Sequence, residues 1–316
     1  MTNFWQKLDK PFTVLAPMDD VTDNVFRQVV TISARPDVFF TEFTNVDGLV
    51  HGGYGAPFRK LKYKKEQHPI VAQIWGTSPA NMQKAAVIIR ELGFDGIDIN
   101  MGCPVRDVVK KGSGAGLIGN FEATSSIIKV VKKGAGGLPV SVKTRLGITK
   151  NTAEEWCTFL LKQKIAALTV HARTAKQMSK GEADWNEIGK TATLRDKIDP
   201  ETIIIGNGDI KNYSEVLQMH RKYKVDGVMI GRGIFLNPWV FEKKTNAKAH
   251  TKKELLTLLV KHIALFEKTW ADTKNFASIK KFLKMYIKDF DGAGKIRIKL
   301  MQASSLAEMK LILTKQ

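Results

Sequence analysis

Short β-rich runs alternate with amphipathic stretches over the first three quarters of the chain. Several runs, such as Ile203–Ile205 and Val228–Ile230, are continuously apolar, as in parallel strands covered on both faces. The pattern predicts eight strands, over residues 12–18, 38–43, 70–76, 96–100, 140–145, 167–173, 202–207 and 227–231. Between them it predicts helices over residues 80–92, 122–133, 152–162 and 213–222. Asn151 or Thr152 can cap the third of these helices.

Eight strand-then-helix units in one run indicate an α/β protein with a closed (β/α)8 barrel, or TIM barrel. An open doubly wound sheet is the alternative, but the turn at residues 19–22 lacks the glycines that such a sheet uses. After Pro238 only helical periodicity follows, over residues 252–268, 277–288 and 296–313. We therefore expect a barrel over residues 1–243 and a small C-terminal α-helical bundle over residues 244–316, joined by a polar linker.

The chain has 316 residues, 43% of them hydrophobic, which suffices for a sizeable core. Its formal net charge of +19 favours a polyanionic partner, with nucleic acid first and an anionic membrane surface second. A general lysine bias is the plain alternative. From Lys243 onward, seventeen basic residues face six acidic ones, so the excess is concentrated in the helical tail. This distribution favours a nucleic acid.

Only two cysteines are present, Cys103 and Cys157, which excludes a disulfide framework and a cysteine zinc site. The N-terminus has no apolar segment of a secretory signal, and no apolar run approaches the roughly 18 residues that span a bilayer. We expect a cytoplasmic protein with no metal, no membrane association and no obligate protein partner.

In a barrel, function collects where the strands end at their carboxyl side. Most of the residues at these points are polar or glycine, where a core would favour Val or Ile. They are Pro17, Met18, Gln73, Asn100, Cys103, Lys143, His171, Asn207, Gly208, Asp209, Gly231 and Arg232. The glycine turns after the last two strands predict a phosphate site, with Arg232 as an added donor.

The remaining titratable residues have plainer interpretations. Cys157 fits a buried position on an apolar helix face, whereas Cys103 lies in a glycine-rich loop at the functional end. Asp95, Asp98 and Asp226 flank strands and are expected in turns or barrel ion pairs. Four histidines without partners at ligand spacing are expected at the surface: His51, His220, His250 and His262.

The chain resembles the tRNA-dihydrouridine synthase family of the bacterial, FMN-dependent type. The motifs that carry the resemblance run in order through nearly the whole chain. They are APM (16–18), VAQIWG (71–76), DINMGCP (98–104), KKGSGAGLI (110–118), VKTRLG (142–147), VHART (170–174), GEADW (181–185), NGDI (207–210), IGRG with NPW (230–239) and KKFLKMYIKDFDGAG (280–294). The resemblance implies reduction of the C5=C6 bond of uridine in tRNA, with FMN as cofactor and NADPH, or NADH, as reductant.

The resemblance also assigns roles. Cys103 is the expected proton donor, and its thiol is mostly protonated at neutral pH. Asn100, Arg145 and Arg173 are expected to contact the substrate. The FMN-binding residues are expected to be Pro17, Met18, Gln73, Lys143, His171, Asn207, Gly208, Asp209, Gly231 and Arg232. Lys143 would lie near the flavin pyrimidine ring, where a cation stabilises the reduced form.

The chain departs from the family pattern after the sixth predicted strand, where Ala172, Ala175 and Ser179 replace a glycine, an arginine and a tyrosine. Lys176 is a candidate to replace the lost positive charge. Two other readings stay open: an FMN barrel acting on a free pyrimidine or an enoate, similar to dihydroorotate dehydrogenase, and an RNA-binding protein without catalysis. The basic tail argues against the first, and intact Cys103, Lys143 and His171 argue against the second.

Overall fold

A computed structural model describes residues 3–53, 55–245, 249–270 and 273–316. The chain forms two compact units. The first comprises residues 1–24, 36–210 and 214–231, and the second comprises residues 25–35, 211–213 and 232–316. The domain boundary near residue 244 stays a prediction from the sequence. Residues 246–248 of the predicted linker lie outside the described residues. None of the described helices is both long and apolar enough to cross a membrane.

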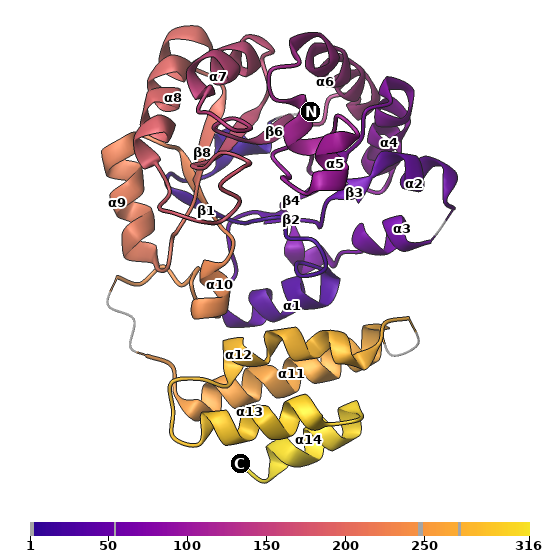
Figure 1. The fold of residues 1–316 in the computed structure, drawn as a ribbon, viewed down its shortest axis with the longest axis vertical. Helices are drawn as coiled ribbons and strands as arrows, with labels where there is room; N and C mark the ends of the chain where they lie inside the picture. Colours follow the sequence, from indigo (N-terminus) through magenta and orange to yellow (C-terminus); the bar gives the residue numbers. More distant parts are fainter. Residues whose placement is uncertain (1–2, 54, 246–248, 271–272) are drawn as a thin grey trace. The chain divides into compact units, whose positions relative to one another are not determined.

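The first unit is a barrel of parallel strands (Figure 1). Its strands are β1 (Phe12–Leu15), β2 (Phe39–Phe40), β3 (Thr44–Asn45), β4 (Ile70–Trp75), β5 (Gly96–Met101), β6 (Val140–Arg145), β7 (Ala167–His171), β8 (Ile203–Asn207) and β9 (Gly227–Ile230). They pair in the order β1-β9-β8-β7-β6-β5-β4-β2, with β3 also on β4. A bridge between Val14 and Val38 joins β1 to the start of β2 and closes the ring. The predicted barrel is confirmed, with β3 as a short additional strand.

The barrel interior has an apolar side and a polar side. The apolar side comes mainly from β1, β2, β8 and β9 and includes Phe12, Phe40 and Ile205. Val71 of β4 and Ala167 of β7 belong to the same cluster. Trp5, from the 3-10 helix η1 (Phe4–Lys7), is fully buried in this cluster and lies 5.8 Å from the Phe12 ring. Strands β4 to β7 contribute the polar side, which has the buried side chains of Gln73, Asp98, Asn100, Ser141 and Thr169 and the partly buried side chain of Lys143.

Helices surround the strands in Figure 1, as expected for an outer layer. Those of the first unit are α2 (Val46–His51), α3 (Ala56–Lys60), η2 (Lys65–Gln67), α4 (Pro79–Glu91), α5 (Arg106–Lys110), η3 (Gly114–Leu117), α6 (Phe121–Ala135), α7 (Ala153–Lys162), α8 (Trp185–Ile198) and α9 (Tyr213–Tyr223). The four predicted helices are confirmed within two residues at each end. Asn151, rather than Thr152, caps α7, because its Oδ1 accepts from the Ala153 amide at 3.0 Å. The helix α8 was not predicted.

The second unit consists of α1 (Asn24–Ser33), α10 (Gly233–Leu236), α11 (Lys252–Trp270), η4 (Phe276–Phe282), α12 (Leu283–Tyr286), α13 (Ala293–Gln302) and α14 (Leu306–Thr314). Its core holds the stacked rings of Phe26 and Phe282. His262 packs against both rings, is 1% exposed and shares a hydrogen bond of 2.8 Å with the Tyr286 hydroxyl. The predicted surface position of His262 is therefore wrong. Its hydroxyl partner satisfies the imidazole inside an apolar core.

The predicted helix over residues 296–313 is in fact two helices, α13 and α14. Ser305 caps α14, since its Oγ accepts from the Glu308 amide at 3.1 Å, and the Glu308 carboxylate accepts from the Ser304 amide. This reciprocal cap is a helix start that the apolar periodicity concealed. The predicted helix over residues 277–288 is mostly the 3-10 helix η4, followed by the single turn α12.

Candidate functional site

A chain of amide hydrogen bonds runs across the polar side of the barrel toward Cys103. The Asn100 Nδ2 donates to Gln73 Oε1 at 3.0 Å. The Asn100 Oδ1 accepts from the backbone amides of Gly102 at 3.1 Å and Cys103 at 2.9 Å. Gln73 and Asn100 lie on neighbouring strands β4 and β5, where Gln73 is in register with Asp98. Three residues that were predicted to share a site are therefore directly connected in one unit of the molecule.

The loop that follows β5 holds Cys103 at a nearly buried position, with 8% of the residue exposed. The Ala115 amide donates to its carbonyl at 3.0 Å. Gly114, with φ +57°, lies so close that a Cβ there would come within 2.9 Å of the Cys103 oxygen. Burial raises the pKa of the Cys103 thiol above its ordinary value, and Arg145 and Lys143 oppose that shift. The thiol is consequently protonated at neutral pH, as a proton donor requires.

Lys143 places a partly buried ammonium among the ends of the strands. Its Nζ donates to the Asn207 Oδ1 at 3.2 Å, and the Asn207 Nδ2 donates to the Met229 carbonyl at 2.8 Å. Burial, together with the nearby charge of Arg145, lowers the pKa of Lys143 to about 8. The ammonium is therefore mainly charged at neutral pH, although the protein partly shields it from water.

Arg145 connects two loops at this end of the barrel. Its Nε donates to the Gly102 carbonyl at 2.7 Å, beside Cys103. Its Nη1 donates to the carbonyls of Thr174 at 3.1 Å and Met178 at 2.8 Å. The residue is 7% exposed. These hydrogen bonds hold the cysteine loop against the loop after β7, so the guanidinium stabilises the site whether or not it also reaches the substrate.

The Arg173 side chain likewise contacts other groups of the protein. It is 1% exposed, forms an ion pair with Asp209 and donates to the Gly181 carbonyl. One guanidinium nitrogen lies 3.4 Å from the His171 Nε2. The Asp209 carboxylate also accepts from the Ala183 amide at 3.0 Å. The predicted residues His171, Arg173 and Asp209 are thus neighbours, and the GEADW segment is fixed to them.

The remaining predicted residues lie at the ends of β1, β8 and β9. The Met18 amide donates to the Thr22 hydroxyl at 2.9 Å, in a turn that directly follows Pro17. Gly208 has φ +145°, and a Cβ there would lie 2.6 Å from the Ala183 Cβ, so packing explains its glycine. Gly231 is the last residue of the first unit, and Arg232 begins the last segment of the second unit. Their cofactor roles stay predictions.

The sequence interpretation missed the role of Asp98. Its carboxylate accepts from Gln73 Nε2 at 2.7 Å and from the Ser141 hydroxyl at 2.6 Å, and the residue is fully buried. It therefore belongs to the amide chain and not to a turn or an ion pair. The signal was available, because Asp98 and Asn100 alternate with Ile97 and Ile99 along β5, and a period of two places them on one face.

Asp226 and Asp95 do follow the expectation. Asp226 forms ion pairs with Arg195 at 2.6 Å and Lys10 at 2.7 Å, where β9 begins. Asp95 contacts the His68 Nδ1 at 2.6 Å. Cys157 is fully buried on α7, as predicted. No group of three His, Cys, Asp or Glu side chains in the described part of the chain is arranged to hold a metal ion.

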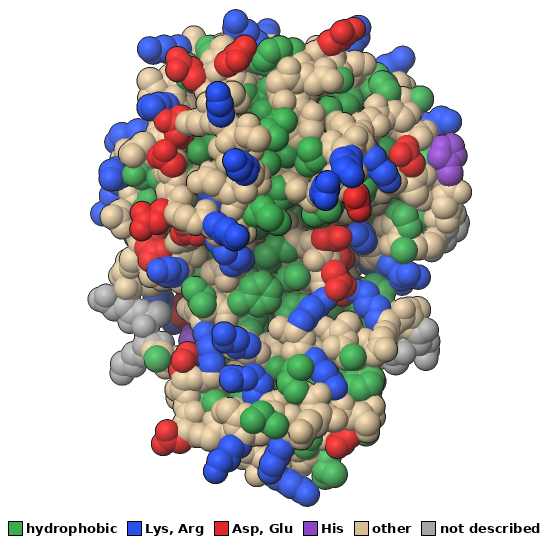
Figure 2. Space-filling model, viewed as in Figure 1, with side chains coloured by type: hydrophobic (Ala, Val, Ile, Leu, Met, Phe, Trp, Pro, Cys, Tyr) green, Lys and Arg blue, Asp and Glu red, His purple; other side chains and the backbone are tan. Residues whose placement is uncertain are grey.

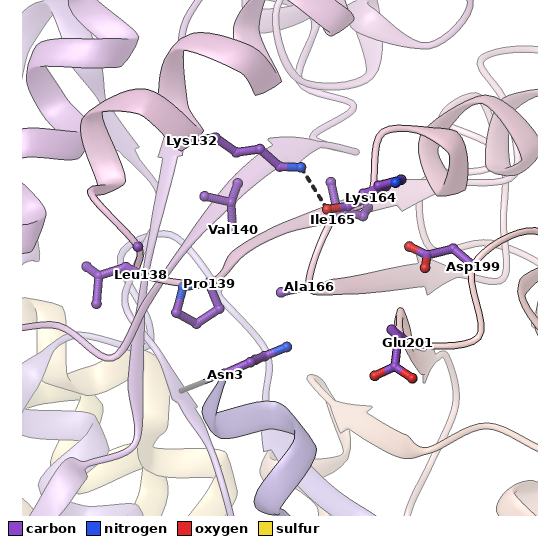
Figure 3. Close-up of a pocket in the computed structure, with 11 residues that line it drawn as sticks. Asn3, Lys132, Leu138, Pro139, Val140, Lys164, Ile165, Ala166, Asp199 and Glu201 are labelled. Atoms are coloured by element: carbon purple, nitrogen blue, oxygen red, sulfur yellow. Dashed lines mark hydrogen bonds between the residues drawn. The ribbon is translucent and has the colours of Figure 1, made fainter. Parts of the chain in front are cut away.

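A cavity of about 510 Å³ lies at the other end of the barrel (Figure 3). Lys132, Lys164, Asp199 and Glu201 line it, together with residues 137–140 that lead into β6. The Lys132 Nζ donates to the Lys164 carbonyl at 2.7 Å. A groove of about 850 Å³ lies outside the strands, along α7 and Glu187. Neither contains a residue of the candidate site.

Comparisons with known proteins agree with these observations. The sequence profile of the dihydrouridine synthase (Dus) family matches residues 14–316. The "Probable tRNA-dihydrouridine synthase" of Staphylococcus aureus is 47% identical over 314 residues, which covers 98% of this chain and 94% of the relative. The "Probable tRNA-dihydrouridine synthase 2" of Bacillus subtilis is 46% identical, with 98% and 95% covered.

The fold also has structural neighbours. A variant of the NCR protein from Zymomonas mobilis superimposes with a TM-score of 0.52 at 16% identity, covering 80% of this chain and 97% of that chain. The family match reaches residue 316 and so includes the helical tail. The alternative interpretation, an enzyme that acts on free pyrimidines, does not account for this tail. The chain belongs to the dihydrouridine synthase family, whose members are flavin-dependent oxidoreductases that draw on a nicotinamide reductant.

Proposed function

We propose that this protein is a cytoplasmic tRNA-dihydrouridine synthase that holds FMN at the carboxyl ends of the barrel strands and takes its electrons from NADPH. The observation that carries the proposal is the arrangement of a protonated thiol and a partly buried ammonium around one amide chain, in Cys103, Lys143 and Asn100. Two relatives that are named for this activity are 47% and 46% identical over nearly the whole chain.

The donor set fits a flavin. Lys143 is a partly buried cation that hydrogen-bonds to a neutral amide, so an anionic ligand would compensate its charge. Gln73 keeps one N–H and one oxygen lone pair beyond its bonds to Asp98 and Asn100. These groups suit the N–H and carbonyl edge of the isoalloxazine pyrimidine ring. His171, Asn207, Gly208, Asp209, Gly231 and Arg232 are the proposed phosphate end, and Pro17 and Met18 the proposed backbone contacts.

The bound flavin supplies the hydride that adds to C6 of the uracil. Negative charge then develops on the uracil O4 and C5, and Cys103 donates the proton that C5 requires. Asn100 fixes the backbone of the cysteine loop through two N–H bonds, so the thiol keeps one position during the transfer. Arg145 and Lys143 are the nearby cations that stabilise the thiolate left behind. The proposed substrate contacts are Asn100, Arg145 and Arg173.

The tRNA would bind to basic surface. On the visible face, Lys and Arg side chains lie on both units, with acidic residues between them (Figure 2). Several tail cations serve the fold: Lys280 donates to the carbonyls of Met301 and Ala303, and Arg297 donates to that of Ile287. Lys284, Lys295 and Lys299 are exposed and better suited to phosphate contacts.

The proposal is tested with purified holoenzyme, NADPH and tRNA from a strain that lacks the enzyme. Dihydrouridine detected by nucleoside mass spectrometry supports it, and flavin turnover without dihydrouridine contradicts it. A triple variant, Lys284→Gln, Lys295→Gln and Lys299→Gln, should bind tRNA less tightly and with a shallower salt dependence, by about one unit of slope for each phosphate that is no longer neutralised. Lys164→Gln and Lys132→Gln, at the opposite cavity of the barrel, are the control.

A further inference from the structure

The proposed reaction assigns no role to the carboxylate of Asp98. It is fully buried on β5, and its hydrogen-bond partners are neutral: the Gln73 amide at 2.7 Å and the Ser141 hydroxyl at 2.6 Å. No lysine or arginine within the described residues forms an ion pair with it. A buried charge without a directly paired cation is costly, so its retention calls for a reason other than stability.

The hydrogen bonds of this chain have a fixed direction. An ionised carboxylate only accepts, so the Gln73 amide must turn its Nε2 toward Asp98 and its Oε1 toward Asn100. Asn100 then donates through Nδ2 and accepts through Oδ1. At the far end the backbone amides of Gly102 and Cys103 only donate, and they require that same Oδ1. Both ends of the chain therefore enforce one orientation of the two side-chain amides.

This orientation decides what the site offers to a ligand. Beyond their mutual bonds, Gln73 keeps one N–H and one lone pair, and Asn100 keeps one N–H. If the Gln73 amide turned over, its NH2 group would face the Asn100 NH2 group, and the chain would break at that point. The bond that holds Asn100 against the cysteine loop would lose its support.

We infer that Asp98 is a positioning residue that fixes the orientation of the Gln73 and Asn100 amides and, through Asn100, the backbone of the Cys103 loop. The inference rests on the proposed function for the identity of the ligands that meet these amides. Burial raises the pKa of Asp98 to about 6, against the opposing effects of its two hydrogen bonds and the Lys143 charge. The carboxylate is therefore the accepting form at about pH 8.

The test uses flavin-loaded enzyme in three single variants. Asp98→Asn keeps the shape and removes the obligate acceptor. Ser141→Ala removes the second donor to the carboxylate and changes no charge, so an effect there is not electrostatic. Asp226→Asn removes a different buried carboxylate of the same barrel and is the matched control. The first readout is the rate at which iodoacetamide alkylates Cys103 without RNA, followed by mass spectrometry, with buried Cys157 as internal reference.

Asp98→Asn should raise Cys103 alkylation about tenfold and Ser141→Ala by a smaller factor, because the loop is then held less firmly. The second readout is tRNA-dependent oxidation of reduced enzyme. Asp98→Asn should lower kcat by about 10- to 100-fold with little change in KM, since tRNA docking is unaltered. Asp226→Asn should match wild type in both readouts.

Wild-type behaviour of both Asp98→Asn and Ser141→Ala overturns the inference, as does an equal response from Asp226→Asn. If Asp98→Asn does not fold, Ser141→Ala decides alone, by its alkylation rate. Failure of the proposed function is distinguishable, since the wild-type enzyme would then leave tRNA unreduced. The alkylation rates would still decide whether Asp98 positions the loop.

Discussion

Two of the buried aspartates of the barrel unit, Asp98 and Asp226, have surroundings that differ in kind. Asp226, at the start of β9, is held by two cations, Arg195 and Lys10, and by the Ile204 amide at 2.7 Å. Asp98, inside β5, accepts hydrogen bonds from neutral donors alone. Hydrogen bonds to Lys10, Ile204 and Arg195 lower the pKa of Asp226 against the effect of burial, whereas burial raises that of Asp98 to about 6.

This difference distinguishes an aspartate that stabilises the fold from one that belongs to the candidate site. A carboxylate with two cations contributes to stability and can be understood from the folded state alone. A carboxylate with neutral partners costs stability, and such strain is retained where it orients groups for a ligand. Substitutions of Asp226 and of Asp98 should therefore have separate effects, the first on folding stability and the second on activity.

The largest effect is expected at the residue that the amide chain supports. Cys103→Ala should bind flavin and accept electrons from NADPH, because the thiol acts only on the uracil. Its oxidation by tRNA should be roughly 10²- to 10⁴-fold slower, the usual loss for a general acid. Stopped-flow absorbance of the reduced flavin measures this step. Cys157→Ala removes the other thiol and should react at the wild-type rate, and reoxidation of Cys103→Ala at that same rate would remove Cys103 from the mechanism.

The scaffold aspartate should show the second largest effect, on stability. Asp226→Asn leaves Arg195 with a neutral partner and should lower the free energy of unfolding at pH 7 by about 2–4 kcal/mol. The folded pKa of Asp226 is lowered, so its contribution is present above the ordinary pKa of 3.8 and is lost as the pH falls through the folded value. Urea unfolding at several pH values should show the variant's deficit shrinking in acid. A deficit that persists there would locate the loss in packing.

Lys143 should show an intermediate effect on the flavin. Because a cation stabilises the reduced, anionic form, Lys143→Met should lower the flavin midpoint potential by about 30–60 mV. The protein alone holds the pKa of Lys143 at about 8, so the difference between wild type and variant should narrow above that pH as the lysine loses its proton. Potentiometric titration against dyes measures both. Lys132→Met, which also removes a lysine of lowered pKa but lines the opposite cavity, should leave the potential unchanged.

Much of this organisation follows from the sequence. Apolar strands at regular spacing predict the closed barrel, and strand-end polarity predicts that Gln73, Asn100 and Cys103 meet. Local caps and contacts between residues distant in the sequence were harder to predict. The break before Ser305 is a local cap inside a continuous apolar pattern, and His262 is buried because Tyr286 supplies its hydrogen bond. Asp98 and Asp226 look alike in the sequence. Only the structure shows that Asp98 meets neutral groups on the neighbouring strands, whereas Asp226 meets Arg195 of α8 and Lys10 before β1.

The smallest effect should be the stability of Asp98→Asn, and it should have the opposite pH dependence to that of Asp226→Asn. The folded pKa of Asp98 is raised, so the native state binds the proton more tightly, and wild-type stability falls as the pH rises from about 3.8 to about 6. Ionisation then costs about 3 kcal/mol in total, a value that already includes the hydrogen bonds from Ser141 and Gln73 that favour the charged group. An asparagine avoids this cost, but only its Oδ1 accepts, so one of the two hydrogen bonds is lost. We therefore expect the variant to lie within about 1 kcal/mol of wild type above pH 6 and to be the less stable protein below pH 4. Urea unfolding across this range decides the point, because a large deficit near neutral pH would mean that Asp98 stabilises the fold as Asp226 does.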